Sequence, residues 1–390
     1  MRLGVATLLL VVVLAGSGHA TSSPVTAVFA HPSYTPGAFA RLNVTADATS
    51  LSVQALAALP QRGREPTALN APHTIPWRPG SGTVWTRIDP NWPSGVYFFR
   101  VRTARSEAYA PVVVRPVRLG ENTVAVVVPT YTWQAYNTRD GGTWYQCPCI
   151  RTIDLDRPYD GTGVPAHFVA YEQGFLEWLT SRSVPVDFLS DQDLGRFTSG
   201  DQLRRLYRLV VFSGHEEYVT RDEYDLVERY RDLGGHLMFL SADNFFREVV
   251  VNGRWMTLIG RWRDLGRPEA ALLGSQYIDW NQGRYKNRPY RVVGAEKLPW
   301  LFLGTRLRDG SPIRGSFGIE IHGLAPSSPP GTVVIAEIPH VFGTETAQMT
   351  YYGTAQGAEV FAAGSMNFGG SALLPDVSAL LVNLWAHMAD

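Results

Sequence analysis

Polar side chains gather directly after several predicted strands, and their types suit metal chemistry. Histidine, glutamate and tyrosine are all metal ligands, and a tyrosinate is a hard, anionic ligand that favours a trivalent ion. Because parallel strands end at one edge of a sheet, these side chains are expected to share a rim. Taken singly, each has an ordinary structural explanation, but their convergence favours a site. The rim comprises Tyr136, Asn137, His215, Glu216, Glu217, Asp243 and Asn244.

Covalent catalysis by a strand-terminal nucleophile has no support in these segments. A glutaminase-like fold would place Cys or Ser on a tight turn after a strand. The nearest approach is Ser213-Gly214, which lacks the Gly-x-Ser-x-Gly pattern. A metal site is therefore the favoured interpretation.

The elements that would position this rim begin near residue 123. Residues 124–128 form a continuous β-branched run, typical of a strand buried on both faces. Predicted helices and strands then alternate to residue 240, and Thr220 to Glu223 reads as a capping box. This alternation predicts an α/β domain over 119–390 with a doubly wound, mostly parallel sheet of flavodoxin or glutamine amidotransferase type. Residues 250–345 are irregular and rich in Trp and Arg, and are expected to be an insertion.

The segment before residue 119 has a different periodicity of apolar residues. Residues 40–44 and 51–56 alternate with period two, Pro and Gly clusters separate such runs, and no helical pattern interrupts them. Residues 21–118 are therefore expected to form a small immunoglobulin-like β-sandwich.

The first twenty residues predict export. Arg2 precedes an apolar run over 3–15, and small residues end at Ala20, which is the pattern of a signal peptide over 1–20. A secreted or periplasmic bacterial protein with no membrane segment after cleavage is the expectation. In such a compartment Cys147 and Cys149 are either a local loop staple or bystanders, since zinc would need further ligands.

Composition narrows the classes of partner. The 390 residues carry 35 Lys+Arg against 35 Asp+Glu, so the basic face needed for nucleic-acid binding is not indicated. Hydrophobic residues make up 45% of the chain, enough for the cores of two domains.

Three motifs together resemble the C-terminal region of the N,N-dimethylformamidase large (beta) subunit. The first is Tyr131-x-Trp133-x-Ala135-Tyr136-Asn137 with a following Gly-Gly, and the second is Ser213-Gly214-His215-x-Glu217-Tyr218. The third runs from Gly234-Gly235 to Asn244-Phe245-Phe246, and the segment 357–365 also fits.

The resemblance implies an amide hydrolase with one iron ion (Fe3+) held by two tyrosinates and a glutamate. Carried over to this chain, the glutamate is Glu217 and one tyrosine is Tyr136. The other is placed at Tyr97, with Tyr131 as the competitor. The same resemblance implies that His215 acts as an acid/base and that Asn244 donates a hydrogen bond to substrate or water.

The chain also departs from this family. The family's large subunit is much longer and works with a small subunit, and the family enzyme is expected to be cytoplasmic. Dimethylformamide itself is therefore not the expected substrate, and another small amide takes its place.

A different class of function remains open at this stage. The Trp-rich stretch would instead let a non-catalytic exported protein stack on a carbohydrate or other ligand, and the β-sandwich would support a homo-oligomer. The candidate stacking residues are Trp255, Trp262, Trp280 and Trp300.

Overall fold

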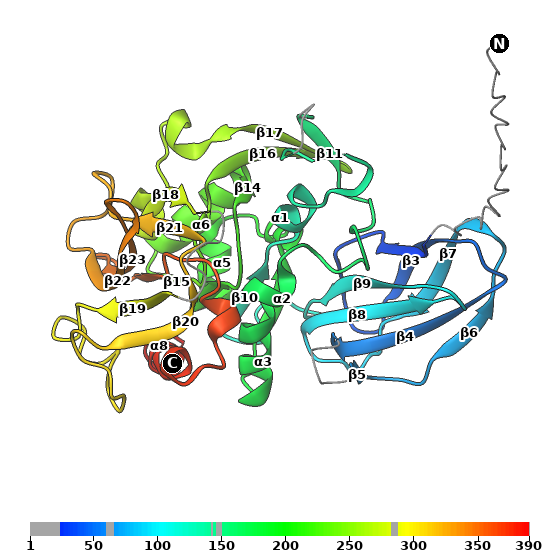
Figure 1. Ribbon diagram of the computed structural model, residues 1–390, viewed down its shortest axis with the longest axis horizontal. Coiled ribbons are helices and arrows are strands. Elements are labelled where there is room, and N and C mark those ends of the chain that lie inside the picture. Colours follow the sequence, from blue (N-terminus) through cyan, green and yellow to red (C-terminus); the bar gives the residue numbers. More distant parts are fainter. Residues whose placement is uncertain (1–23, 60–65, 142, 146–149, 282–287, 390) are drawn as a thin grey trace, which may run out of the picture.

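The computed structural model describes residues 24–59, 66–141, 143–145, 150–281 and 288–389 (Figure 1). The predicted signal peptide and the pair Cys147 and Cys149 lie outside these residues. No helix in the described ranges is long and apolar enough to cross a membrane.

The N-terminal strands form two sheets, drawn in blue and cyan at one end of the molecule (Figure 1). One has the order β1-β3-β7 and the other β2-β9-β8-β4-β5, with β6 also pairing with β4. Alternate side chains of both sheets, such as Leu42 and Val101, share one core. Their bounds are β1 Thr26–Phe29, β2 Ser33–Tyr34, β3 Phe39–Ala46, β4 Ser50–Ala58, β5 Thr67–Ala68, β6 His73–Pro76, β7 Gly80–Arg87, β8 Gly95–Arg102 and β9 Glu107–Val114.

The largest sheet has nine strands in the order β12-β10-β13-β15-β24-β23-β22-β19-β20. The first five are parallel, and every pair from β24 to β20 is antiparallel. The bounds are β10 Val124–Val128, β12 Asp187–Ser190, β13 Leu209–Phe212, β15 His236–Phe239, β19 Arg288–Val292, β20 Pro312–Phe317, β22 Val333–Phe342, β23 Glu345–Gly353 and β24 Glu359–Ala362.

Two smaller sheets lie beside it. One has the order β11-β17-β16-β14 and the other pairs β18 with β21. Their bounds are β11 Thr152–Asp154, β14 Tyr218–Thr220, β16 Arg247–Asn252, β17 Trp255–Arg261, β18 Gln276–Trp280 and β21 Glu320–Gly323.

The helices are short, and the two longest pack on opposite faces of the parallel strands. Val126 of β10 shares a core with Leu380 of α8, while Val127 shares another with Tyr230 of α6. The bounds are α1 Thr130–Ala135, α2 Phe168–Tyr171, α3 Gln173–Ser181, α4 Asp191–Leu194, α5 Gly200–Leu206, α6 Arg221–Asp232, α7 Ala270–Leu273 and α8 Pro375–Met388, with 3-10 turns η1 Arg139–Gly141, η2 Trp262–Leu265 and η3 Gly369–Ser371.

The predicted fold class, a doubly wound and mostly parallel α/β sheet, is wrong. The chain is mostly β, with mixed and antiparallel sheets throughout. The error has a physical origin in residues 250–345, where the expected irregular insertion instead holds the hairpin strands β19, β20 and β22. These strands extend the main sheet in the antiparallel sense, so a fold read from residues 124–240 misses half of it. The division at residue 118 and the immunoglobulin-like label stay predictions.

Candidate metal centre

Glu217 is a buried carboxylate on which tyrosine and charged side chains converge. It follows β13, is 2% exposed, and its Oε2 accepts hydrogen bonds from the Tyr136 hydroxyl at 2.8 Å and the Tyr145 hydroxyl at 3.0 Å. The rings of Tyr136 and Tyr145 stack with centroids 4.5 Å apart. Its other oxygen, Oε1, accepts from Arg247 Nε at 3.0 Å. Two phenol oxygens therefore converge on one carboxylate oxygen.

His215 stands against the same carboxylate. Its Nε2 lies 3.4 Å from Glu217 Oε2, 3.6 Å from Glu320 Oε2 and 3.8 Å from Asp243 Oδ2. This nitrogen is buried and has no hydrogen-bond partner among the described residues. His215, Glu217 and Asp243 offer ligand atoms that all lie within 4.8 Å of one another.

Burial controls the protonation of this group. It lowers the pKa of His215 to about 4, against the opposing effect of the Glu217 charge, so the imidazole is neutral at pH 7. Burial, followed by the Asp243 charge, raises the pKa of Glu217, while His215, Arg247 and Tyr136 act in the other direction.

The two tyrosines are held as neutral phenols. Burial and then the Glu217 charge raise the pKa of Tyr136 and of Tyr145 well above the usual value. A tyrosinate forms here only when a bound cation replaces the phenol proton, because coordination favours the anion.

The surrounding cavity has a volume of about 570 Å³ and is walled by aromatic rings. Phe246, Tyr277 and Trp280 form one side, and Tyr171 and His167 stack on each other with centroids 5.0 Å apart. The space suits a small ligand with an apolar part, since aromatic walls exclude water from the polar end.

The structure brings four of the sequence-predicted site residues together, namely Tyr136, His215, Glu217 and Asp243, and it places the others elsewhere. Tyr97 belongs to the β-sandwich core, where its ring stacks on Trp92 with centroids 4.8 Å apart and its hydroxyl donates to Pro93 O at 2.9 Å. Tyr97 therefore packs in the sandwich and not against Glu217, which favours another tyrosine as the second ligand.

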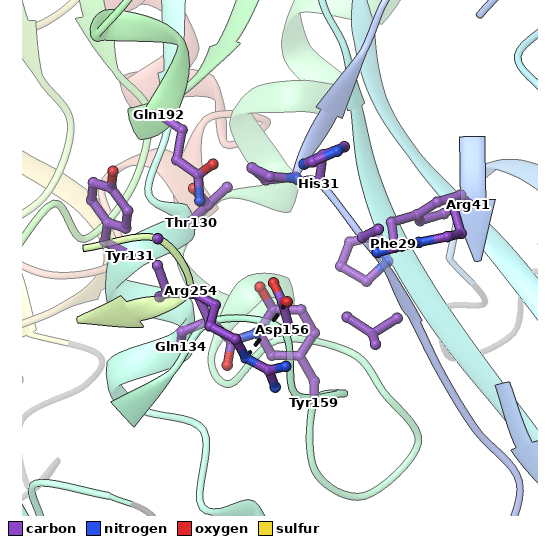
Figure 2. Close-up of a pocket in the computed structure, with 16 residues that line it drawn as sticks. Phe29, His31, Arg41, Thr130, Tyr131, Gln134, Asp156, Tyr159, Gln192 and Arg254 are labelled. Atoms are coloured by element: carbon purple, nitrogen blue, oxygen red, sulfur yellow. Dashed lines mark ion pairs between the residues drawn. The ribbon is translucent and has the colours of Figure 1, made fainter. Parts of the chain in front are cut away.

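The competing tyrosine, Tyr131, faces a different cavity. This cavity has a volume of about 350 Å³ and lies between β1 and α1, with Arg254 and Asp156 paired at 3.7 Å on its wall (Figure 2). Five helical positions separate Tyr131 from Tyr136, about 140° around α1, so the two rings leave the helix in different directions.

Asn244 hydrogen-bonds to the backbone beside the site and is not among the residues that line its cavity. Its Oδ1 accepts from Glu216 N at 2.9 Å, and its Nδ2 is buried without a partner in the described part of the chain. Asn137 likewise donates to Pro158 O at 3.1 Å. Both rim amides therefore shape loops.

Three residues of the site escaped the sequence reasoning. Tyr145 lies beside the cysteine pair in an irregular segment, Arg247 begins β16, and Glu320 begins β21 on a strand that was not expected. Only Tyr145 carried a signal, because it lies nine positions after Tyr136 within the same long loop.

The four tryptophans of the ligand-binding alternative do not form one surface. Trp262 is fully buried and Trp300 stacks on His387 with centroids 3.8 Å apart, while Trp255 is 50% exposed on β17. Only Trp280 lines the cavity at Glu217 among the pockets described.

Two curated relatives of this chain are N,N-dimethylformamidase beta subunits. Over 255 residues it is 24% identical to the N,N-dimethylformamidase beta subunit of an Alcaligenes species, covering 50% of this chain and 33% of that protein. It is 23% identical over 386 residues to the beta subunit of Paracoccus aminophilus, covering 71% and 50% respectively. The chain therefore spans half or less of the length of these curated relatives.

Similarity to solved structures adds nothing to this. Cwp6 from Clostridium difficile matches with a TM-score of 0.16 and 9% identity over 56% of this chain and 37% of that one, which carries no argument. The decisive match is a family model that spans residues 37–376, from just before β3 to the start of α8. The chain belongs to the family described as N,N-dimethylformamidase beta subunit-like, C-terminal.

Proposed function

We propose that this chain is an iron-dependent hydrolase that cleaves the C–N bond of a small amide in the cavity at Glu217. The observation that carries the proposal is the convergence of the Tyr136 and Tyr145 hydroxyls on one oxygen of Glu217, at 2.8 and 3.0 Å. The family and the names of its relatives support the reaction class.

The residues present fit an iron ion held by two tyrosinates and one glutamate. Tyr136, Tyr145 and Glu217 would hold it, with Tyr145 taking the place first assigned to Tyr97. Three hard oxygen donors in a buried site match a trivalent ion better than a soft one. When bound, iron supplies Lewis acidity that polarises an amide carbonyl and acidifies water.

His215 is the residue best placed to move protons. Its imidazole is neutral, and its buried Nε2 is free of hydrogen bonds within the described structure and faces the cavity. It would take a proton from the attacking water and return it to the departing amine nitrogen. The amide and one water are thereby converted to a carboxylic acid and an amine.

Two acids beside His215 would assist this transfer. Glu320 and Asp243 lie 3.6 and 3.8 Å from Nε2, and burial raises the pKa of each carboxyl well above its usual range. As carboxylates these acids would offset the charge of an imidazolium during turnover, and their burial favours the protonated form before that charge develops.

The cavity favours small amides with apolar substituents on nitrogen. Phe246, Tyr277 and Trp280 contribute aromatic surface to its wall. Alkyl groups can pack on this wall while the carbonyl points to Glu217 and His215.

Export to the periplasm or medium, and association of the chain with itself, are further parts of the proposal. The signal-like pattern over 1–20 supports the first. The second is supported only by the relatives, which are named as subunits.

The test is metal content, a visible spectrum and amine release, measured on full-length protein expressed with iron supplied. We expect about one iron per chain and a visible tyrosinate-to-iron absorption band. We also expect amine release from at least one amide in a panel of N-alkyl formamides and acetamides. Glu217→Gln should lose the iron and the activity together. A colourless, iron-free wild-type protein that is folded by circular dichroism would refute the iron assignment.

A further inference from the structure

A second group of buried acids lies near Glu217 and is not used by the proposed reaction. Asp191 follows β12, Glu216 follows β13, and Glu223 stands in the first turn of α6. The three side chains are at most 4% exposed, and each offers a carboxylate oxygen within 4.8 Å of the others.

Most carboxylate oxygens of these three acids accept no hydrogen bond in the described structure. Asp191 Oδ2 accepts from the backbone N of Tyr131, and Glu223 Oε2 accepts from Thr220 N at 3.4 Å. The remaining four oxygens are buried and have no hydrogen-bond partner in the described structure: Asp191 Oδ1, Glu223 Oε1, and both oxygens of Glu216. Glu216 is thus a fully buried side chain whose polar end has no described donor and lies against the Asp191 carboxylate.

In the described part of the chain, no basic side chain forms an ion pair with this group. Among the described residues, none of the three carboxylates forms an ion pair with Arg, Lys or His. An unpaired buried carboxylate is strongly unfavourable, so a native fold that places three together implies a counter-charge from outside the chain or shared protons.

We propose that Asp191, Glu216 and Glu223 bind a calcium ion. Ca2+ takes six to eight oxygen ligands at about 2.3–2.6 Å, so ligands on opposite sides of it are up to about 5 Å apart. Mg2+ holds its ligands at about 2.1 Å and is usually bound through one or two carboxylates with several waters. The group has no thiol or imidazole among its ligand atoms, which argues against zinc.

The site also has a route for the ion and for its remaining water ligands. A cleft of about 820 Å³ opens beside it, and both Asp191 and Glu223 line this cleft. The cleft therefore gives Ca2+ a route from solvent to Asp191 and Glu223 and leaves room for waters on that side.

The ion would steady the loop that carries the iron ligand. Along residues 215–217 successive side chains point to opposite sides, so His215 and Glu217 face one group of acids and Glu216 faces the other. Fixing Glu216 fixes the backbone of its neighbours, while the two sites share no ligand.

The experiment is a calcium titration of the full chain after treatment with a chelator. We expect one saturable Ca2+ per chain by equilibrium dialysis, with a Kd of about 10 μM or tighter. We also expect a rise of about 3 °C or more in melting temperature at about 1 mM Ca2+. Mg2+ should bind more weakly in a matched titration.

The variants assign the site. Glu216→Gln keeps the shape of the side chain and should weaken Ca2+ binding by about 100-fold or more. If this variant does not fold, Asp191→Asn removes a different carboxylate ligand and tests the same site. Glu217→Gln is the matched control, since it alters the neighbouring group of acids and should keep calcium binding unchanged. An absence of saturable Ca2+ binding by the wild type would overturn the proposal in favour of shared protons. Unchanged binding in Glu216→Gln, or tighter binding of Mg2+ than of Ca2+, would overturn it as well.

Discussion

Replacing Tyr145 by phenylalanine tests the corrected ligand set directly. The change removes one oxygen and leaves the ring that stacks on Tyr136. If Tyr145 is the second tyrosinate, the variant loses most of its visible absorption and binds iron more weakly, because one of three anionic donors is gone. The expected loss of iron affinity is about 10-fold to 100-fold.

The cost to the metal-free fold can be worked out from the contacts of this hydroxyl. It donates to Glu217 Oε2 at 3.0 Å and shares a hydrogen bond with the Tyr218 hydroxyl. A hydrogen bond to a charged group contributes about 1.5–3 kcal/mol, and burial of the hydroxyl keeps water from replacing the lost bond. We therefore expect a loss of about 2 kcal/mol in the free energy of unfolding.

Tyr97→Phe is the matched control. That hydroxyl makes one hydrogen bond, to Pro93 O in the sandwich, so the variant should lose about 1 kcal/mol of stability and keep the spectrum. Both variants are measured by urea unfolding of the chelated protein and by visible spectroscopy after iron loading. An intact absorption band in Tyr145→Phe, or a lost band in Tyr97→Phe, would refute the assignment.

Three further predictions concern pH, backbone geometry and substrate binding. Burial raises the pKa of Glu172 to about 8, so the fold binds a proton that the unfolded chain releases near pH 4.5. This group's contribution therefore falls by about 3 kcal/mol as pH rises from 5 to 8. Glu172→Gln should remove this pH-dependent loss of stability. The measurement is the urea midpoint of the variant and of the wild type at several pH values from 5 to 8. Gly163→Ala places a Cβ 2.1 Å from Tyr109 O at a φ of +85°, and should cost about 3 kcal/mol or more in chemical unfolding. Gly161→Ala, at +58° with nothing within 4 Å, should cost about 1 kcal/mol. Trp280→Ala removes an apolar wall of the cavity and should raise KM for N-alkyl amides by about 10-fold with kcat nearly unchanged.

Part of the site was predictable because a run of buried β-branched residues marks a strand, and the end of the run marks where its loop begins. The buried run 124–128 and the run ending at Phe212 mark strands whose carboxyl ends share one edge, so Tyr136, His215 and Glu217 were expected together. Tyr97 could not be excluded in this way, since its side of the strand depends on the sandwich core into which Tyr97 packs.

The remaining site residues depend on tertiary pairing that a single sequence does not encode locally. Glu320 reaches His215 because β21 pairs with β18, and Arg247 reaches Glu217 because β16 pairs with β14. The same long-range pairing carries β19, β20 and β22 into the main sheet, which is why both the fold class and half of the site were missed.

Overall neutrality conceals a strong local imbalance at this edge of the sheet. Basic and acidic side chains are equal in number over the chain, yet five buried acids and one partly buried acid lie in the two groups. Among them only Glu217 is ion-paired with an arginine, Arg247, in the described structure. These acids are Asp191, Glu216, Glu217, Glu223, Asp243 and Glu320. Such an excess is stable only if protons or cations accompany it. Alternation along residues 215–217 divides the acids into a group with phenols, which suits a trivalent ion, and a group of carboxylates alone, which suits Ca2+. One short loop would thereby order both proposed sites, and removing Glu217 or Glu216 should abolish one without the other.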